Sequence, residues 1–291
     1  YPLNTAELDQ DEQALQQVLQ SAKSQRVPTM TQLVDLIAIN ELLGTVESSG
    51  DGKNANLVAQ LETESLADKA AEFKTTNNDD TIGWIRIPNT NVDYPVVYKA
   101  GVENYAYYES KGYDKQYSKD GVIWADYECT FPELSQNTTL YGHNWHNIYT
   151  PRTQANMQAN DLMFSLVMSY NYTDFAQENP FIYFSTTEQD YVFQVFASYY
   201  TDLNFGYNYA QMSQEDFQKV IAEAKAKSLS NYNVPVTSED KIVTLSTCTR
   251  VHGNTNNQRF VVMAKLVPVG TPSTTISTHS NPIAYNSSID A

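Results

Sequence analysis

The chain has 291 residues, of which 41% are hydrophobic and 12% aromatic, and its formal net charge is −16. This length and apolar content suffice for one large domain with appendages or for two small domains, and they exclude a disordered chain. The acidic balance argues against nucleic acid as a partner and against electrostatic docking on anionic lipid, because both need basic patches.

The first part of the chain has the residue spacing of helices. Leu8, Leu15 and Leu19 recur near helical spacing, and two similar segments follow over 31–44 and 56–73. The most apolar of these stretches is too short to span a membrane and contains charged residues. The sequence begins at Tyr1 rather than at a methionine, so we expect that a natural leader or membrane anchor precedes it.

From Thr81 onward the pattern changes to short runs of β-branched and aromatic residues separated by turn residues. About eight strands are predicted, which is the content of a closed or nearly closed β-barrel. The predicted fold class is therefore mostly β, an eight-stranded barrel with helical insertions and a helical N-terminal region. The predicted strands cover residues 82–87, 92–98, 121–126, 137–142, 181–186, 191–200, 241–248 and 259–269.

Two helical insertions interrupt the strands, at 159–170 and at 213–228, and Ser213 is the predicted N-cap of the second. The last residues are rich in Ser, Thr, Pro and Asn with little to bury, so a flexible tail is predicted. The predicted domain organisation is a helical region over 1–78, a catalytic barrel over 79–269 and a flexible tail over 270–291.

The chemically reactive residues are few, since the whole chain has two cysteines and four histidines. Cys248 ends a predicted strand within the stretch TLSTCTR, residues 244–250. A lone cysteine at a strand end is most often a packing residue. A disulfide to Cys129 would require Cα atoms within about 7 Å, which the sequence does not decide. Cys129 itself has no histidine or basic neighbour in the sequence, so we expect it to be a packing residue.

A thiol is activated by a nearby base or cation, and histidine is the usual base. His143 follows a predicted strand in the stretch LYGHNWHN, where a turn would present it at the rim of the barrel. A zinc site can be drawn from Cys248, His252, His143 and His146, but their spacing matches no standard ligand set. We therefore expect no metal. His279 lies in the predicted tail and is set aside.

Two arginines are candidates for the third component of an acyl-transfer site. Arg250 lies two residues after Cys248, and Arg259 begins the last predicted strand. A guanidinium group is permanently charged and forked, so it can hold a carbonyl oxygen or a developing oxyanion. The residues themselves leave the choice between the two arginines open.

At these residues the sequence resembles the sortases, class B in particular. The stretches GWIRIPNTNVDYPVV, LYGHN, TLSTC and RFVVMAKL resemble the entry strands, the histidine motif, the cysteine motif and the arginine-bearing strand of that family. The matching blocks run from about residue 80 to 267 in the order and spacing of the family. The helical N-terminal region and the helix at 213–228 distinguish class B from the shorter class A.

The resemblance implies a sortase-type β-barrel and a cysteine transpeptidase on the extracellular face of a Gram-positive membrane, held there by an anchor outside this chain. Such an enzyme cleaves a sorting signal in a surface protein and joins the new carboxyl end to an amine of peptidoglycan or of a pilin. No metal or organic cofactor is implied. Residue by residue, Cys248 matches the nucleophile, His143 the acid/base and Arg259 the oxyanion-binding group. The substrate-binding positions implied by the resemblance are Asn104, Tyr108, Tyr141, Ser246 and Thr247.

Two other classes of protein remain as alternatives. An L,D-transpeptidase also carries a C-x-R sequence at its cysteine, but it has a glycine before the cysteine where this chain has Thr247. Its histidine also lies close upstream of the cysteine, unlike His143. A non-enzymatic surface scaffold would leave the co-occurrence of Cys248, His143 and Arg259 unexplained.

Overall fold

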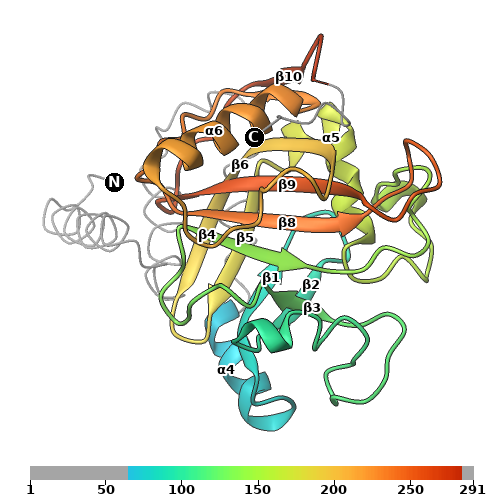
Figure 1. Ribbon diagram of the computed structural model, residues 1–291, viewed down its shortest axis with the longest axis vertical. Coiled ribbons are helices and arrows are strands. Elements are labelled where there is room, and N and C mark those ends of the chain that lie inside the picture. Colours follow the sequence, from blue (N-terminus) through green and yellow to red (C-terminus); the bar gives the residue numbers. More distant parts are fainter. Residues whose placement is uncertain (1–64, 284–291) are drawn as a thin grey trace, which may run out of the picture.

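Eight strands close into one barrel in the computed structural model, which describes residues 65–283 (Figure 1). Most neighbouring strands are antiparallel, but β2 pairs with β3, and β4 with β8, in parallel. The predicted fold class is confirmed, and each predicted strand is present. Around the barrel the strands are β1 (Thr81–Arg86), β2 (Asp93–Val97), β3 (Ile123–Ala125), β4 (Asn137–Tyr141), β8 (Ile242–Cys248), β9 (Gln258–Val267), β6 (Asp190–Asp202) and β5 (Phe181–Thr186), which pairs with β1.

The core of the barrel consists of aromatic and β-branched side chains from these strands. Phe184, Phe193, Phe196 and Phe260 are almost completely buried, and each such ring contributes roughly 1.5–3 kcal/mol by leaving water. All six residues of β5 are buried, so both faces of this strand are covered. Because both faces are covered, the residues of this strand do not alternate strictly between apolar and polar.

Helix α4 (Leu66–Thr76) packs against β1 at one side of the barrel (Figure 1). The hydroxyl of its N-cap residue, Ser65, accepts a hydrogen bond from the backbone N–H of Asp68 (3.2 Å). The carboxylate of Asp190 accepts a second bond at this helix end, from the N–H of Ala67 (2.8 Å). The helix is the C-terminal part of the segment predicted over 56–73, and the rest of the predicted helical region lies outside the described residues.

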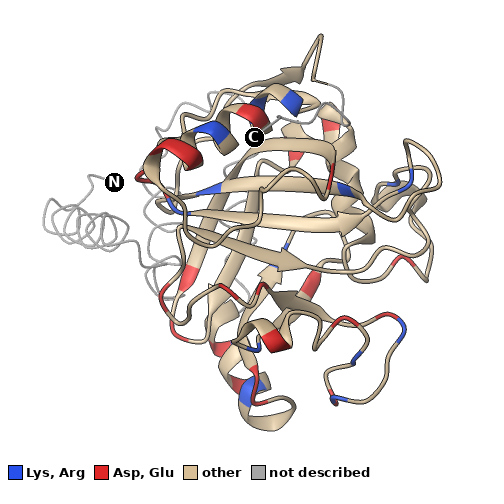
Figure 2. Ribbon diagram, in the orientation of Figure 1, with Lys and Arg blue, Asp and Glu red and all other residues tan. Residues whose placement is uncertain are grey.

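Helix α6 (Gln214–Lys227) packs on the outside of β6 and confirms the insertion predicted at 213–228. Ser213 is its N-cap, as predicted, and its hydroxyl accepts a hydrogen bond from the N–H of Asp216 (3.1 Å). The buried face of the helix carries Phe217 and Ile221, which join the barrel core. Figure 2 shows that the exposed side of this helix carries charges of both signs.

The helix predicted over 159–170 is wrong in its first half. There the chain forms turns, because the buried carboxylate of Asp161 is paired with Arg152 (2.8 Å) and Met163 adopts a left-handed φ of 53°. Neither feature is visible in the spacing of apolar residues. The short helical elements of the described chain are η1 (Val102–Asn104), η2 (Gln154–Asn156), η3 (Ser165–Asn171) and α5 (Thr173–Glu178).

The prediction of a flexible tail from residue 270 is wrong for the part that the structure describes. Strand β10 (Ile276–Thr278) pairs with β7 (Ser230–Tyr232), and the side chain of Ile276 is buried. The amide of Gln177 accepts a hydrogen bond from the N–H of Ile276 (2.6 Å). One buried residue and a few hydrogen bonds order this segment, and composition does not reveal them. Residues 284–291 lie outside the described part.

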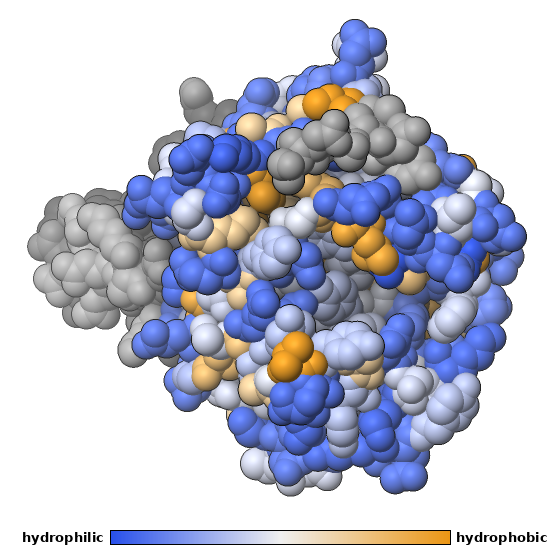
Figure 3. All heavy atoms as spheres, in the orientation of Figure 1, coloured by the Kyte–Doolittle hydropathy of each residue, from blue (hydrophilic) through white to orange (hydrophobic). Residues whose placement is uncertain are grey.

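The face drawn in Figure 3 is mostly hydrophilic and carries small, separate apolar patches rather than one continuous apolar area. None of the helices within 65–283 has the length and apolar character needed to cross a membrane.

Candidate active site

The pairing of three strands brings Cys248, His143 and Arg259 together. Strands β4 and β8 run in parallel with Tyr141 opposite Ser246, so the residues two positions further on emerge at the same end of the barrel. Those residues are His143 and Cys248. Strand β9 lies antiparallel to β8, and its Arg259 is the direct partner of Cys248. Sequence reasoning predicted this proximity, and the strand register explains it.

A pocket of about 370 Å³ opens at this end of the barrel. Its walls come from β3, β4, β8 and β9, from the loop after β2 and from the loop after β6. Of the predicted site residues it contains Cys248, His143, Arg259, Tyr141, Ser246 and Thr247. The other lining residues are Tyr105, Ala106, Glu109, Trp124, Asp126, Tyr127, Gly142, Leu203, Phe205, Tyr207 and Asn208.

Cys248 is half-buried at the last position of β8. The strand end is fixed to the histidine loop by two hydrogen bonds. The hydroxyl of Thr247 donates to the carbonyl of Gly142 (2.7 Å), and the amide of Asn144 donates to the carbonyl of Cys248 (3.3 Å). These bonds hold the thiol and the histidine loop in one rigid frame.

Cys129 has the opposite environment. It is 2% exposed, and burial raises the pKa of its thiol to about 12. Its S–H faces the carbonyl of Asn137 (3.9 Å). The packing role predicted for Cys129 is confirmed, and both cysteines are free, so the disulfide alternative is wrong.

Three neighbouring residues, Glu109, Trp124 and Trp145, contact the imidazole of His143. Its Nε2 lies 2.5 Å from the carbonyl oxygen of Glu109. A carbonyl oxygen only accepts, so Nε2 carries a hydrogen and Nδ1 is the nitrogen left to exchange a proton with reactants. The ring packs against Trp124 and Trp145, with centroid distances of 5.7 and 5.1 Å. At Gly121, φ is +62° and a Cβ atom would come within 2.8 Å of the ring, so glycine is required there.

The two arginines differ in where their guanidinium groups lie. Arg259 lines the pocket, and its Nη1 donates to the carbonyls of Asn256 and Gln258, both at 2.9 Å. Arg250 is not a lining residue. Its guanidinium is hydrogen-bonded to the side chain of Asn256, and its backbone N–H donates to Ile148 (2.7 Å). Of the two, Arg259 is therefore the one that accompanies Cys248.

The remaining histidines lie elsewhere. His146 is exposed, and His279 faces the carbonyl of Ser228 (2.8 Å). His252 packs edge-on against Tyr200 at 4.8 Å, and burial lowers its pKa. Across residues 65–283, no set of three or more His, Cys, Asp or Glu side chains is arranged to hold a metal ion.

Two hydrogen-bonded tyrosines, Tyr141 and Tyr207, line the pocket together with Cys248. The phenol of Tyr141 donates to Asp126 (2.7 Å) and accepts from the amide of Asn208 (3.0 Å). The hydroxyls of Tyr207 and Ser246 are 2.8 Å apart. Burial, reinforced by the negative charge of Asp126, raises the pKa of Tyr141, and burial likewise raises that of Tyr207. Both phenols are therefore neutral hydrogen-bond donors at physiological pH.

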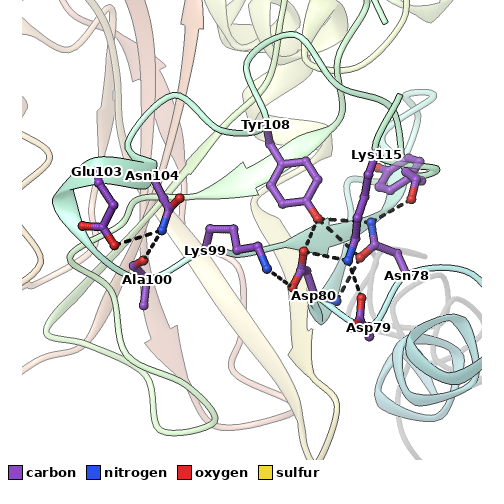
Figure 4. A network of polar contacts seen from close by, with 10 residues as sticks. Asn78, Asp79, Asp80, Lys99, Ala100, Glu103, Asn104, Tyr108 and Lys115 are labelled. Atoms are coloured by element: carbon purple, nitrogen blue, oxygen red, sulfur yellow. Dashed lines mark hydrogen bonds and ion pairs between the residues drawn. The ribbon is translucent and has the colours of Figure 1, made fainter. Parts of the chain in front are cut away.

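Asn104 and Tyr108, predicted to form a substrate wall, are not lining residues. The amide of Asn104 donates to the carbonyl of Ala100 (2.7 Å), and Tyr108 is 1% exposed with its hydroxyl bonded to Asp80 (2.6 Å) (Figure 4). The residues of this segment that do line the pocket are Tyr105, Ala106 and Glu109. The resemblance identified the right segment but the wrong face of it, because the Tyr108 phenol is drawn inward by a charged partner.

Figure 4 shows the network that receives Tyr108. Asp80 also binds the ammonium groups of Lys99 (2.7 Å) and Lys115 (3.1 Å). Partial burial acts to raise the pKa of Asp80, but the hydrogen bonds from Lys99, Tyr108 and Lys115 outweigh it and hold that pKa below its usual range. The network therefore anchors the loop that carries Glu109 to the start of β1.

Sequence reasoning missed Glu109, Trp124, Trp145 and Asp126 in the site. Trp145 is within the quoted stretch LYGHNWHN, two residues after His143, so its proximity was available from the sequence. Glu109 acts on His143 through its backbone carbonyl, which any residue has, so no sequence signal marks it.

Comparison with known proteins agrees with this geometry. The model of the sortase domain family matches residues 85–267. Sortase B of Staphylococcus aureus is 31% identical over 193 residues, which cover 66% of this chain and 72% of that protein. The structure of a Staphylococcus aureus sortase B–substrate complex superposes with a TM-score of 0.58 at 27% identity, covering 75% of this chain and 92% of that one. A sortase B complexed with triglycine gives a TM-score of 0.57 at 27% identity, covering 75% and 93%.

A family match over most of the barrel, relatives that are class B enzymes, and three convergent side chains lead to one conclusion. The chain belongs to the sortase family of cysteine transpeptidases, and its similarity is to the class B members.

Proposed function

We propose that this sortase cleaves a sorting signal near the C-terminus of surface proteins and transfers the resulting acyl group to an amine of the cell wall or of a pilin. The observation that carries the proposal is the convergence of Cys248, His143 and Arg259 on one pocket. Among the relatives, one sortase B was crystallised with a substrate and another with triglycine. Both kinds of ligand suit a two-step transfer.

In the first step the Cys248 thiolate attacks the carbonyl carbon of the scissile peptide bond. A C–S bond forms, and the guanidinium of Arg259 stabilises the charge that develops on the carbonyl oxygen. The protonated imidazole of His143 gives a proton to the leaving nitrogen as the C–N bond breaks. The products are a thioester on Cys248 and a free amine, and His143 is left neutral.

In the second step an incoming amine attacks the thioester. His143 takes a proton from the attacking nitrogen, the new C–N bond forms, and the C–S bond breaks to return the thiolate. The side chains of Tyr141, Ser246 and Thr247 form the wall on which the acyl part of the peptide lies. Transfer rather than hydrolysis requires that the thioester survive until the amine arrives.

The remaining features fit a protein at the cell surface. The barrel and the catalytic groups belong to the region 79–269 that we propose as the catalytic domain. The net charge of −16 and the mostly hydrophilic face drawn in Figure 3 suit an aqueous extracellular setting.

Intact-mass spectrometry tests this proposal. The purified protein is incubated with a peptide that has an Asn-Pro opening followed by a polar residue and Thr, with and without an oligoglycine or a diaminopimelate-bearing peptide. We expect a covalent adduct on the wild-type protein and a ligated product when the amine is present. Release of only the free acid, at a rate that no amine changes, would identify a hydrolase instead.

Two cysteine variants provide the controls. We expect Cys248→Ala to form neither adduct nor product while keeping its fold, because truncation at a half-buried strand end leaves little cavity. Cys129→Ala should keep full activity at some cost in stability, since it removes a buried side chain that does not line the pocket. Retained cleavage in Cys248→Ala would refute the assignment of the nucleophile.

A further inference from the structure

Glu109, one of the two acidic residues that line the pocket, has a carboxylate with no partner among the described residues. Glu109 is exposed, lines the pocket with Cys248 and His143, and places its backbone carbonyl 2.5 Å from Nε2 of His143. Within residues 65–283 its side chain makes no hydrogen bond and no ion pair. The other acidic lining residue, Asp126, is buried, and its two oxygens accept from Tyr141 (2.7 Å) and from the N–H of Glu128 (2.9 Å).

The charges around the pocket are divided between its two sides. Arg259, the direct strand partner of Cys248, is the positive side chain among the lining residues, and no lysine lines the pocket. Glu109 lies beside the histidine. Lys119 is not a lining residue, and its ammonium lies over Trp145, 5.5 Å from the ring centroid. A cation that enters next to His143 therefore meets a free carboxylate.

Resting on the proposed function, we propose that the Glu109 carboxylate is the docking group for the ammonium form of the acceptor amine. His143 gives a proton to the leaving nitrogen and takes one from the entering nitrogen, so both nitrogens occupy the same place beside its ring. The leaving nitrogen is an uncharged amide before cleavage, whereas a primary amine acceptor arrives as a cation. The carboxylate consequently distinguishes the second substrate from the first.

A docking role for the Glu109 carboxylate affects KM and kcat for the amine differently, which a purely structural role would not do. The Glu109 carboxylate strengthens binding of the ammonium, but it also opposes loss of the proton that must leave before the nitrogen attacks. After that proton passes to solvent, the neutral amine attacks the thioester, and His143 accepts a second proton as the C–N bond forms and the C–S bond breaks. Removing the charge should therefore raise KM for the amine without lowering kcat.

The test compares Glu109→Gln with wild type in the two half-reactions separately. Triglycine is the charged acceptor, and hydroxylamine, which is uncharged at neutral pH, is the matched neutral one. The acyl group comes from the signal peptide used above, an Asn-Pro opening followed by a polar residue and Thr. We expect KM for triglycine to rise about two- to fivefold, as for an exposed ion pair, with the rate of thioester formation and the reaction with hydroxylamine unchanged.

Ionic strength and a second variant complete the experiment. In wild type, about 0.5 M salt should raise KM for triglycine toward the value of the variant, and the variant should respond little. Glu103→Gln removes the same charge from an exposed position of the same loop outside the pocket, and it should leave KM for triglycine unchanged.

The outcomes separate failure of this inference from failure of the proposed function. Unchanged KM for triglycine in Glu109→Gln, or an equal rise for hydroxylamine, would overturn the docking role while leaving the transpeptidase intact. An equal rise of KM for triglycine in Glu103→Gln would show that general surface charge causes the change, and it would overturn the docking role of Glu109 as well. No thioester in wild type with any signal peptide would overturn the proposed function and this inference with it.

Discussion

At the scale of single residues, the structure separates two arginines that the sequence leaves equivalent. Both contact Asn256 in the same loop, Arg259 through the backbone carbonyl and Arg250 through the side chain. The difference arises from strand pairing, since Arg259 is in register with Cys248 and Arg250 is not part of the sheet. Distance along the chain is thus a poor guide here, because the residue nearer the cysteine in sequence lies outside the pocket lining.

This separation predicts different kinetics for the two arginine variants. Arg259→Ala should lower kcat/KM on the order of 10²- to 10³-fold, as loss of an oxyanion-stabilising donor does. Arg259→Lys should recover little, because an ammonium lacks the planar fork. Arg250→Ala should lower it no more than about threefold. Steady-state cleavage of the signal peptide measures all three, and the reverse order would assign the catalytic role to Arg250.

At the scale of elements, the loop between β2 and β3 is the part of the site most dependent on remote contacts. It carries Tyr105 and Glu109 on the pocket side and Tyr108 on the inner side. The inner side is held by Asp80 at the start of β1, so the position of the Glu109 carbonyl depends on a network on the opposite side of the loop (Figure 4). The orientation of His143 depends in turn on that carbonyl.

Tyr108→Phe tests this dependence, because it keeps the ring and removes the hydroxyl. We expect kcat to fall on the order of tenfold with little change in KM, since a small shift of a catalytic group is costly. Proton NMR of the imidazole should show a changed environment for the His143 Nε2 hydrogen.

Tyr113→Phe is the matched control, since that phenol also has a buried partner, the carbonyl of Pro95 (2.8 Å). It should cost stability without changing the His143 signal. Equal losses of activity in both variants would indicate a general loss of stability rather than positioning.

The same loop marks the limit of prediction from sequence. Every strand of the barrel was predictable, because runs of β-branched and aromatic residues between turn residues identify strands from local sequence alone. The three reactive residues were predictable as a set through their motifs. The inward turn of Tyr108 and the pairing of β10 with β7 were not, because each depends on a partner distant in the sequence, Asp80 in the case of Tyr108.

At the scale of the whole molecule, the excess of acidic groups makes stability depend on pH. Burial acts to raise the pKa of Asp93, but hydrogen bonds from Trp84 and Arg86 and the charge of Lys69 outweigh it and lower that pKa, as the corresponding bonds do for Asp80. A carboxyl whose pKa is lower in the folded state stabilises the protein above its unfolded pKa of about 3.9. That contribution is lost as the pH falls through the folded pKa.

Thermal unfolding between about pH 5 and pH 2 should therefore show Tm decreasing with falling pH. Asp93→Asn should lower Tm at neutral pH by an amount that corresponds to about 1 kcal/mol or less, as for a partly exposed pair. It should also make the decrease of Tm below about pH 4 shallower, because the variant no longer has this carboxyl group to protonate. Asp174→Asn removes an exposed carboxylate that makes no ion pair among the described residues, and it should leave the slope nearly unchanged. Parallel curves for wild type and Asp93→Asn would contradict the prediction.

The parallel ladder between β4 and β8 also determines which parts of the enzyme are free to change. Gly142 and Thr247 are hydrogen-bonded to each other although they are 105 residues apart in sequence, and the thiol and imidazole follow directly after them. Between these points the loop after β6 contributes Leu203, Phe205, Tyr207 and Asn208 to the walls of the pocket, and α6 follows that loop in the chain, but neither takes part in the pairing of β4 with β8. A graft that exchanges this loop and helix with those of another sortase should transfer peptide preference while the chemistry stays in place. A one-residue deletion within β4 should instead turn the histidine to the other face of the sheet and inactivate the enzyme, because side chains alternate along a strand.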